Sequence, residues 1–170
     1  MSKNMNNTVV TTDQDLVIAR IFDAPPKLVW EAWTDSKHLM RWWGPKDFTS
    51  PVCKIDLRLG GKYLFCMRSP EGQKFWSTGI YKELIPFERI AFTDSFADEK
   101  GNIVPASHYG MPGDNVPLEL SVSISFENLG SKTKMTLCHV GLPAGQMEEM
   151  SGVGWNESFD KLAEYLNDSN

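Results

Sequence analysis

The chain has 170 residues, 41% of them hydrophobic and 23% charged, and 17 basic against 22 acidic side chains give a net charge of -5. This length fits one domain that can bury a core and still enclose a cavity. The acidic balance excludes a general nucleic-acid binder, which carries a basic surface. No apolar run is long enough to cross a bilayer.

The amino-terminal residues and the cysteines bear on domain organisation and location. Residues 1–13 are polar and lack the apolar centre of a signal peptide. We therefore expect a flexible tail there and a single domain over residues 14–168. Cys53, Cys66 and Cys138 are odd in number and widely spaced. This spacing is typical of reduced thiols and predicts a cytoplasmic protein.

The first predicted elements are a strand and two short helices. Residues 15–23 show the apolar pattern of a strand, and Pro25-Pro26 then favour a helix start. Apolar residues at helical spacing follow over residues 27–35. A second short helix is predicted over residues 36–43, capped by its first residue or by the aspartate before it.

The middle of the chain predicts a sheet. Strand-like composition or alternation occurs in residues 51–59, 62–68, 75–84, 89–96, 118–126 and 132–140. Between them, residues 97–117 form a long connection that contains Tyr109 and Met111. Because long loops are usually functional or disordered, these apolar residues favour a packed loop. It is either a lid over a cavity mouth or an anchored surface excursion.

The carboxy-terminal segment predicts an amphipathic helix that begins at Trp155. Phe159, Leu162 and Leu166 follow this tryptophan at spacings of four, three and four residues, which places all four on one face. A single apolar helix needs a partner surface, and a curved antiparallel sheet supplies one. The predicted fold is therefore α+β, with a ligand chamber where the sheet wraps the helix without filling the space between.

Two polar residues are predicted to face the concave side of this sheet. Asp94 alternates with Phe92 and Phe96, and His139 follows Leu137 two positions later. A carboxylate or an imidazole in such a cleft can have a shifted pKa and take part in acid–base chemistry. In the alternative interpretation, both groups only form hydrogen bonds that support the fold.

The sequence contains no motif for a metal or a cofactor. The three histidines lie far apart in sequence, and neither a phosphate-binding loop nor a nucleophile elbow occurs. We therefore expect no metal ion, no cofactor and no motif-defined catalytic residue. The predicted ligand-binding wall is mostly apolar and aromatic, and it comprises Tyr63, Phe65, Met67, Trp76, Phe92, Asp94, Tyr109, Leu118, Leu120, His139, Trp155 and Phe159.

Several segments resemble one protein family along nearly the whole chain. They are ARIFDAPPKLVWEAWTDSKHLMRWWGP, KIDLRLGGKYLFCMRSPEG, GIYKELIPFERIAFTDSF, KTKMTLCHVGLP and GVGWNESFDKLAEYL. The family is the bacterial and archaeal group named after the activator of the 90-kDa heat-shock protein's ATPase, within the START-like or SRPBCC superfamily. The resemblance implies a helix-grip fold with two small helices after the first strand, and a cavity for small apolar or aromatic molecules. It carries over no catalytic residue.

Three functions stay open at this point. The first is binding of a small hydrophobic or aromatic ligand. The second is an enzyme, such as a cyclase, dehydratase or hydrolase of a small aromatic or polyketide-like compound, with Asp94 and His139 as acid and base. The third is a co-chaperone-like partner of a heat-shock ATPase, disfavoured because the eukaryotic co-chaperone has a further amino-terminal domain. We expect no nucleic-acid partner and no membrane insertion, whereas open sheet edges would permit a homodimer.

Overall fold

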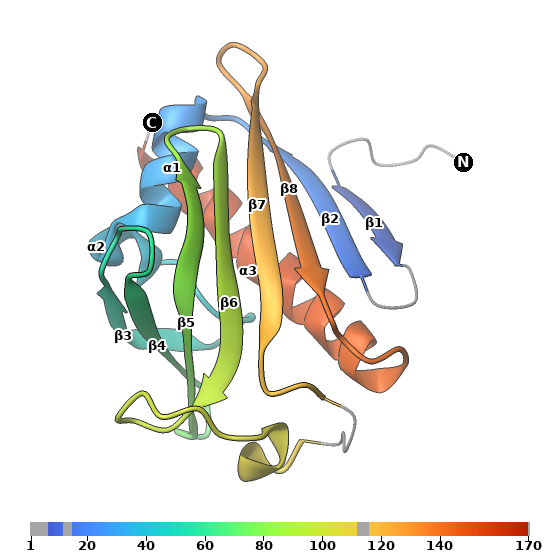
Figure 1. The fold of residues 1–170 in the computed structure, drawn as a ribbon. Coiled ribbons are helices and arrows are strands. Elements are labelled where there is room, and N and C mark those ends of the chain that lie inside the picture. Colours follow the sequence, from blue (N-terminus) through green and yellow to red (C-terminus); the bar gives the residue numbers. More distant parts are fainter. Residues whose placement is uncertain (1–6, 12–14, 112–115, 170) are drawn as a thin grey trace.

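A single antiparallel sheet curves around one long helix in this computed structural model, which describes residues 7–11, 15–111 and 116–169 (Figure 1). Within these residues the sheet has eight strands in the order β1-β2-β8-β7-β6-β5-β4-β3. The strands are β1 (Asn7–Thr11), β2 (Asp15–Phe22), β3 (Thr49–Ile55), β4 (Lys62–Arg68), β5 (Lys74–Ile85), β6 (Arg89–Ala97), β7 (Leu120–Asn128) and β8 (Thr133–Val140).

The helices connect and close this sheet. Two short helices, α1 (Pro26–Thr34) and α2 (Ser36–Leu39), link β2 to β3, and the long helix α3 (Gln146–Ser169) follows β8. Helix α1 begins at Pro26, where the missing N–H is harmless. The Asp35 carboxylate caps α2 by accepting a hydrogen bond of 2.9 Å from the Lys37 N–H.

The predicted α+β helix-grip architecture is confirmed, although several elements differ in their bounds. The second short helix ends at Leu39 instead of residue 43, and β3 spans Thr49–Ile55 instead of residues 51–59. Residues 7–11, which the sequence assigned to a flexible tail, form the edge strand β1 paired with β2. Helix α3 begins at Gln146, well before Trp155. Strand β7 begins at Leu120, so that Leu118 lies in the preceding connection with 57% of its surface exposed.

The core lies between α3 and the concave face of the sheet. Phe159, Leu162 and Leu166, three members of the predicted helical face, are almost completely buried. Arg20 of β2 is also buried beneath the helix, where its guanidinium donates a hydrogen bond of 2.7 Å to the Asp160 carboxylate. These contacts hold the carboxy-terminal half of α3 against the sheet.

The loop between α2 and β3 is held against helix α3. Lys161 of α3 donates hydrogen bonds to the carbonyl oxygens of Gly44, Pro45 and Phe48 at 3.0, 3.2 and 3.0 Å. Gly44 has φ +103°, a left-handed conformation in which glycine is unstrained. The lysine therefore ties this loop to the helix. None of the helices in the described residues is both long and apolar enough to span a membrane.

Candidate functional site

A cavity of about 400 Å³ opens between the amino-terminal half of α3 and the concave face of the sheet. Small-molecule sites generally measure about 300–1,000 Å³, so a compact ligand fits this space. Side chains from five strands, the α2–β3 loop, the connection before β7 and α3 form its wall, namely Trp43, Gly44, Pro45, Phe48, Met67, Phe75, Ser77, Asp94, Ser95, Phe96, Met111, Val116, Pro117, Leu118, Leu120, His139, Leu142, Met147, Met150, Ser151, Gly154, Trp155 and Ser158.

Among the described residues, Asp94 and His139 are the two ionisable ones in this wall. They extend from β6 and β8, and the strand β7 between them brings the side chains together. His139 Nε2 lies 3.6 Å from Asp94 Oδ2, which is beyond hydrogen-bond distance. The pair therefore forms one polar spot in an otherwise mainly apolar cavity.

Trp155 fixes the proton position on His139. The indole Nε1–H donates a hydrogen bond of 3.0 Å to His139 Nδ1. Because an indole nitrogen only donates, Nδ1 is the acceptor and carries no proton. The neutral imidazole then holds its proton on Nε2, which is buried and has no hydrogen-bond partner within the described residues. His139 therefore holds a buried N–H without a protein partner at the cavity wall.

Asp94 is held by a tyrosine on one side only. The Tyr63 hydroxyl lies 2.8 Å from the Thr93 carbonyl oxygen and 3.2 Å from Asp94 Oδ1, so that its single proton is shared between two acceptors. Oδ2 accepts no hydrogen bond among the described residues, and 26% of the side-chain surface stays accessible. The free oxygen lies on the cavity side, near His139.

Burial shifts both groups toward their neutral forms. Loss of hydration raises the pKa of Asp94 from 3.8 to about 6, against a smaller opposing effect of the Tyr63 hydroxyl. Burial lowers the pKa of His139 from 6.5 to about 4, and the Trp155 N–H opposes a proton on Nδ1 as well. At neutral pH the pair therefore comprises a carboxylate and an uncharged imidazole.

We expect Asp94→Asn to stabilise the protein at neutral pH. The folded state binds a proton on Asp94 more tightly than the unfolded state, so this group lowers stability as pH rises from about 4 to about 6. The lowered pKa of His139 has the opposite consequence, because it raises stability as pH rises over nearly the same range. In the wild type this gain masks the loss caused by Asp94. Urea unfolding gives the difference in free energy of unfolding between the variant and the wild type. This difference should increase in favour of the variant by about 1–3 kcal/mol between pH 4 and 7.5. A difference that does not change with pH would contradict this.

Six residues of the predicted site lie on this wall: Met67, Asp94, Leu118, Leu120, His139 and Trp155. Alternation along β4, β6 and β8 predicted the orientation of Met67, Asp94 and His139. The structure thus brings together the two polar candidates that the sequence placed on one face. Ligand binding by these residues stays a prediction.

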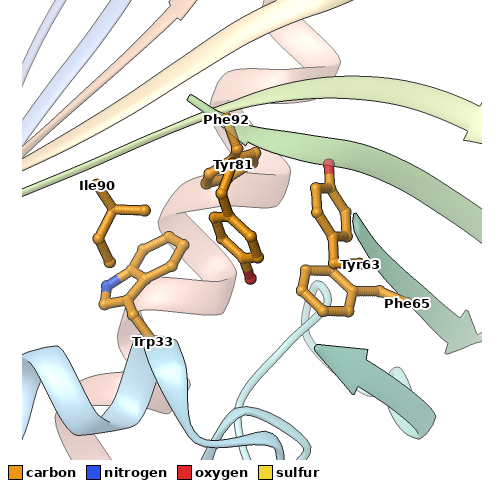
Figure 2. A pocket seen from close by; sticks show the side chains of 6 residues that line it. All are labelled: Trp33, Tyr63, Phe65, Tyr81, Ile90 and Phe92. Atoms are coloured by element: carbon orange, nitrogen blue, oxygen red, sulfur yellow. The ribbon is translucent and has the colours of Figure 1, made fainter. Parts of the chain in front are cut away.

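Three predicted residues lie beside the cavity instead of on its wall. Tyr63, Phe65 and Phe92 surround a separate void of only about 10 Å³, together with Trp33, Tyr81 and Ile90 (Figure 2). Tyr63 and Phe65 stack with ring centroids 4.3 Å apart. Such a void is at the lower limit for one water molecule, so these aromatic residues form core, and only the Tyr63 hydroxyl reaches the site.

The remaining three predicted residues lie away from the cavity. Trp76 occupies the position of β5 between Phe75 and Ser77, and alternation directs it to the other face of the sheet. Tyr109 lies behind the wall, where its ring packs on Phe75 and its hydroxyl accepts a hydrogen bond of 3.1 Å from the Trp76 N–H. Phe159 is completely buried and belongs to the core.

Sequence reasoning missed much of the wall contributed by α3 and by the α2–β3 loop. Met147 and Met150 precede Trp155, in helical turns that contain Gly152 and Gly154 and lack a clear apolar period. The sequence therefore carries no clear periodic signal for these two methionines. Trp43 falls within the predicted helix over residues 36–43, but α2 ends at Leu39 and Trp43 lies in the loop between α2 and β3.

The curved sheet, the long carboxy-terminal helix and the enclosed cavity define a helix-grip protein of the START-like class. The chain belongs to the family of activator of Hsp90 ATPase homolog 1-like proteins, whose sequence pattern matches residues 23–167. No curated protein matches the chain.

Solved bacterial structures share the fold over almost their whole length. A protein from Arthrobacter aurescens is 26% identical, with a TM-score of 0.79 over 95% of this chain and 91% of that one. One from Chromobacterium violaceum is 28% identical, with a TM-score of 0.75 over 91% and 98%. The AHSA1 protein of Silicibacter pomeroyi is 26% identical, with a TM-score of 0.74 over 92% and 99%.

Proposed function

We propose that this protein binds a small, mainly apolar molecule in the cavity between α3 and the sheet. The observation that carries the proposal is a mainly apolar space of about 400 Å³ whose described wall contains one ionisable pair. Burial of a ligand's apolar surface supplies the main driving force. The methionines Met67, Met111, Met147 and Met150 add side chains that adapt to ligands of different outline.

A matched pair of tryptophan substitutions tests this function. Ser77 of β5 lines the cavity, whereas Ser121 of β7 is exposed on the opposite face of the sheet. We expect Ser77→Trp to fill the cavity and to weaken binding of the neutral fluorescent probe N-phenyl-1-naphthylamine by about tenfold or more, equivalent to about 1.4 kcal/mol. Ser121→Trp should bind the probe like the wild type. Equal affinities in the two variants, or no binding by the wild type, would refute the proposal.

A second function, acid–base catalysis on the bound molecule, is favoured by the position of Asp94 and His139. Both side chains reach the same cavity, and the Asp94 pKa of about 6 suits a general base near neutrality. Native mass spectrometry of protein incubated with cell extract separates the two functions. Compounds released unchanged support binding alone, whereas a chemical change that Asp94→Asn abolishes supports catalysis. Stimulation of a heat-shock ATPase stays a prediction from the family resemblance.

A further inference from the structure

The polar spot of the cavity presents one donor and one acceptor at fixed positions. The donor is His139 Nε2–H, since Trp155 occupies Nδ1. The acceptor is Asp94 Oδ2, since the Tyr63 hydroxyl lies against Oδ1. Neither atom has a hydrogen-bond partner within the described residues, and only 5% of the His139 surface is exposed. A buried donor without a partner is unfavourable, so a ligand that accepts from it gains affinity.

The two atoms are close enough to share one ligand atom. They lie 3.6 Å apart, which is less than twice a hydrogen-bond length of about 2.8 Å. One oxygen can therefore accept from Nε2–H and donate to Oδ2 at the same time. A hydroxyl group has this combination, because its oxygen carries both a proton and lone pairs.

Other polar groups match the spot less well. A carboxylate would lie against the Asp94 carboxylate, and the neutral His139 supplies no positive charge to offset the repulsion. Lys161 of α3 donates its hydrogen bonds to carbonyl groups of the α2–β3 loop instead. A ketone would accept from His139 but leave Asp94 without a donor. An ammonium group would pair with Asp94 but face the imidazole N–H with another donor.

We propose that the cavity binds an apolar molecule that carries a hydroxyl group, with this hydroxyl held between His139 Nε2–H and Asp94 Oδ2. The proposal rests on the binding function proposed above and specifies its ligand class. Trp155 acts as a positioning residue, because its indole N–H keeps the imidazole in the tautomer that donates toward the cavity.

Matched naphthalene derivatives test the ligand class. Displacement of N-phenyl-1-naphthylamine at pH 7.5 gives the affinities of naphthalene, 2-naphthol and 2-naphthoate. We expect 2-naphthol to bind about tenfold more tightly than naphthalene, as two net hydrogen bonds allow, and 2-naphthoate to bind more weakly than naphthalene. If naphthalene and 2-naphthol bind equally, the hydroxyl proposal is wrong and the binding function stands. If the fluorescent probe itself does not bind, both are wrong.

Two variants and one control test the residues. Asp94→Asn removes the carboxylate, and Trp155→Phe removes the indole N–H while keeping an aromatic ring. Each should reduce the preference for 2-naphthol over naphthalene to about twofold or less. The control, Trp76→Phe, changes a tryptophan outside the cavity and should keep the full preference. An unchanged preference in Asp94→Asn would refute the proposal.

The tautomer can be measured without any substitution. In ¹⁵N NMR spectra of the wild type, His139 should show a protonated Nε2 and an unprotonated Nδ1 at pH 7.5. Trp155→Phe should shift these signals toward a mixture of the two tautomers, which a purely structural role of Trp155 would not produce. A proton on Nδ1 in the wild type would overturn the proposal. Because this measurement needs no variant, it remains decisive if a variant fails to fold.

Discussion

Gly79→Ala should destabilise the protein by about 4 kcal/mol or more, among the largest effects expected for a single methyl group. A Cβ atom at position 79 would lie 1.8 Å from the Thr93 carbonyl oxygen and 2.6 Å from a ring carbon of Tyr63. The closer atom belongs to the backbone, so no side-chain rotation relieves the clash. Strands β5 and β6 would have to separate next to Asp94. Urea unfolding, or circular dichroism if the variant does not fold, measures the loss.

Gly152→Ala provides the matched control for this prediction. Among the described residues, its Cβ would meet only Leu16 Cδ1, at 3.7 Å, which is an ordinary contact. Gly152 lies inside α3, where alanine replaces glycine with a gain of roughly 0.5–1 kcal/mol. The same substitution is therefore expected to have opposite signs at the two positions. A loss below about 1 kcal/mol for Gly79→Ala would show that the sheet accommodates the methyl group.

Phe159→Ala should lower the free energy of unfolding by about 3–5 kcal/mol, as is usual for a phenylalanine removed from a core. Its ring is completely buried and packs against Phe22, Trp33, Trp42 and Trp155, with centroid distances of 6.5, 6.2, 6.3 and 5.6 Å. The surrounding rings cannot all move inward, so a cavity would remain. Chemical denaturation at 25 °C gives the value directly.

Met150→Ala is the comparison that distinguishes a residue of the cavity wall from a residue of the hydrophobic core. Met150 lines the cavity from the same helix, but 43% of its surface is exposed. We expect this variant to change stability by no more than about 0.5 kcal/mol and to weaken binding of N-phenyl-1-naphthylamine severalfold. A loss of stability as large as that of Phe159→Ala would place Met150 in the core and would move the edge of the cavity.

Helical and strand periods explain why some site residues could be predicted. Asp94 and His139 each follow apolar residues at the two-residue spacing of a strand, and both lie on the cavity wall. The same spacing does not fix the face of Trp76, which was predicted to line the wall, because both faces of β5 carry apolar side chains. Its neighbours Phe75 and Ser77 face the cavity instead. Periodicity thus identifies a face only where the other face is clearly polar.

A one-dimensional pattern also does not separate a core residue from a wall residue. Trp155 and Phe159 lie one helical turn apart on the same apolar face, yet only Trp155 lines the cavity. Trp155 borders the cavity, whereas the rings of Phe22, Trp33 and Trp42 pack around Phe159. Both residues have the same type of sequence signal.

The sequence by itself determined the α+β class, the order of the helices and of strands β2 to β8, and the concave position of Asp94 and His139, because these follow from local periods and composition. The family followed from the resemblance of its segments and not from these periods. Only the tertiary structure decided which of the inward-facing residues enclose the cavity. It also decided that Trp155 donates to His139 Nδ1 and that Nε2 lies 3.6 Å from Asp94. Such distances depend on how three strands and a helix pack together, and no local pattern in the chain encodes that packing.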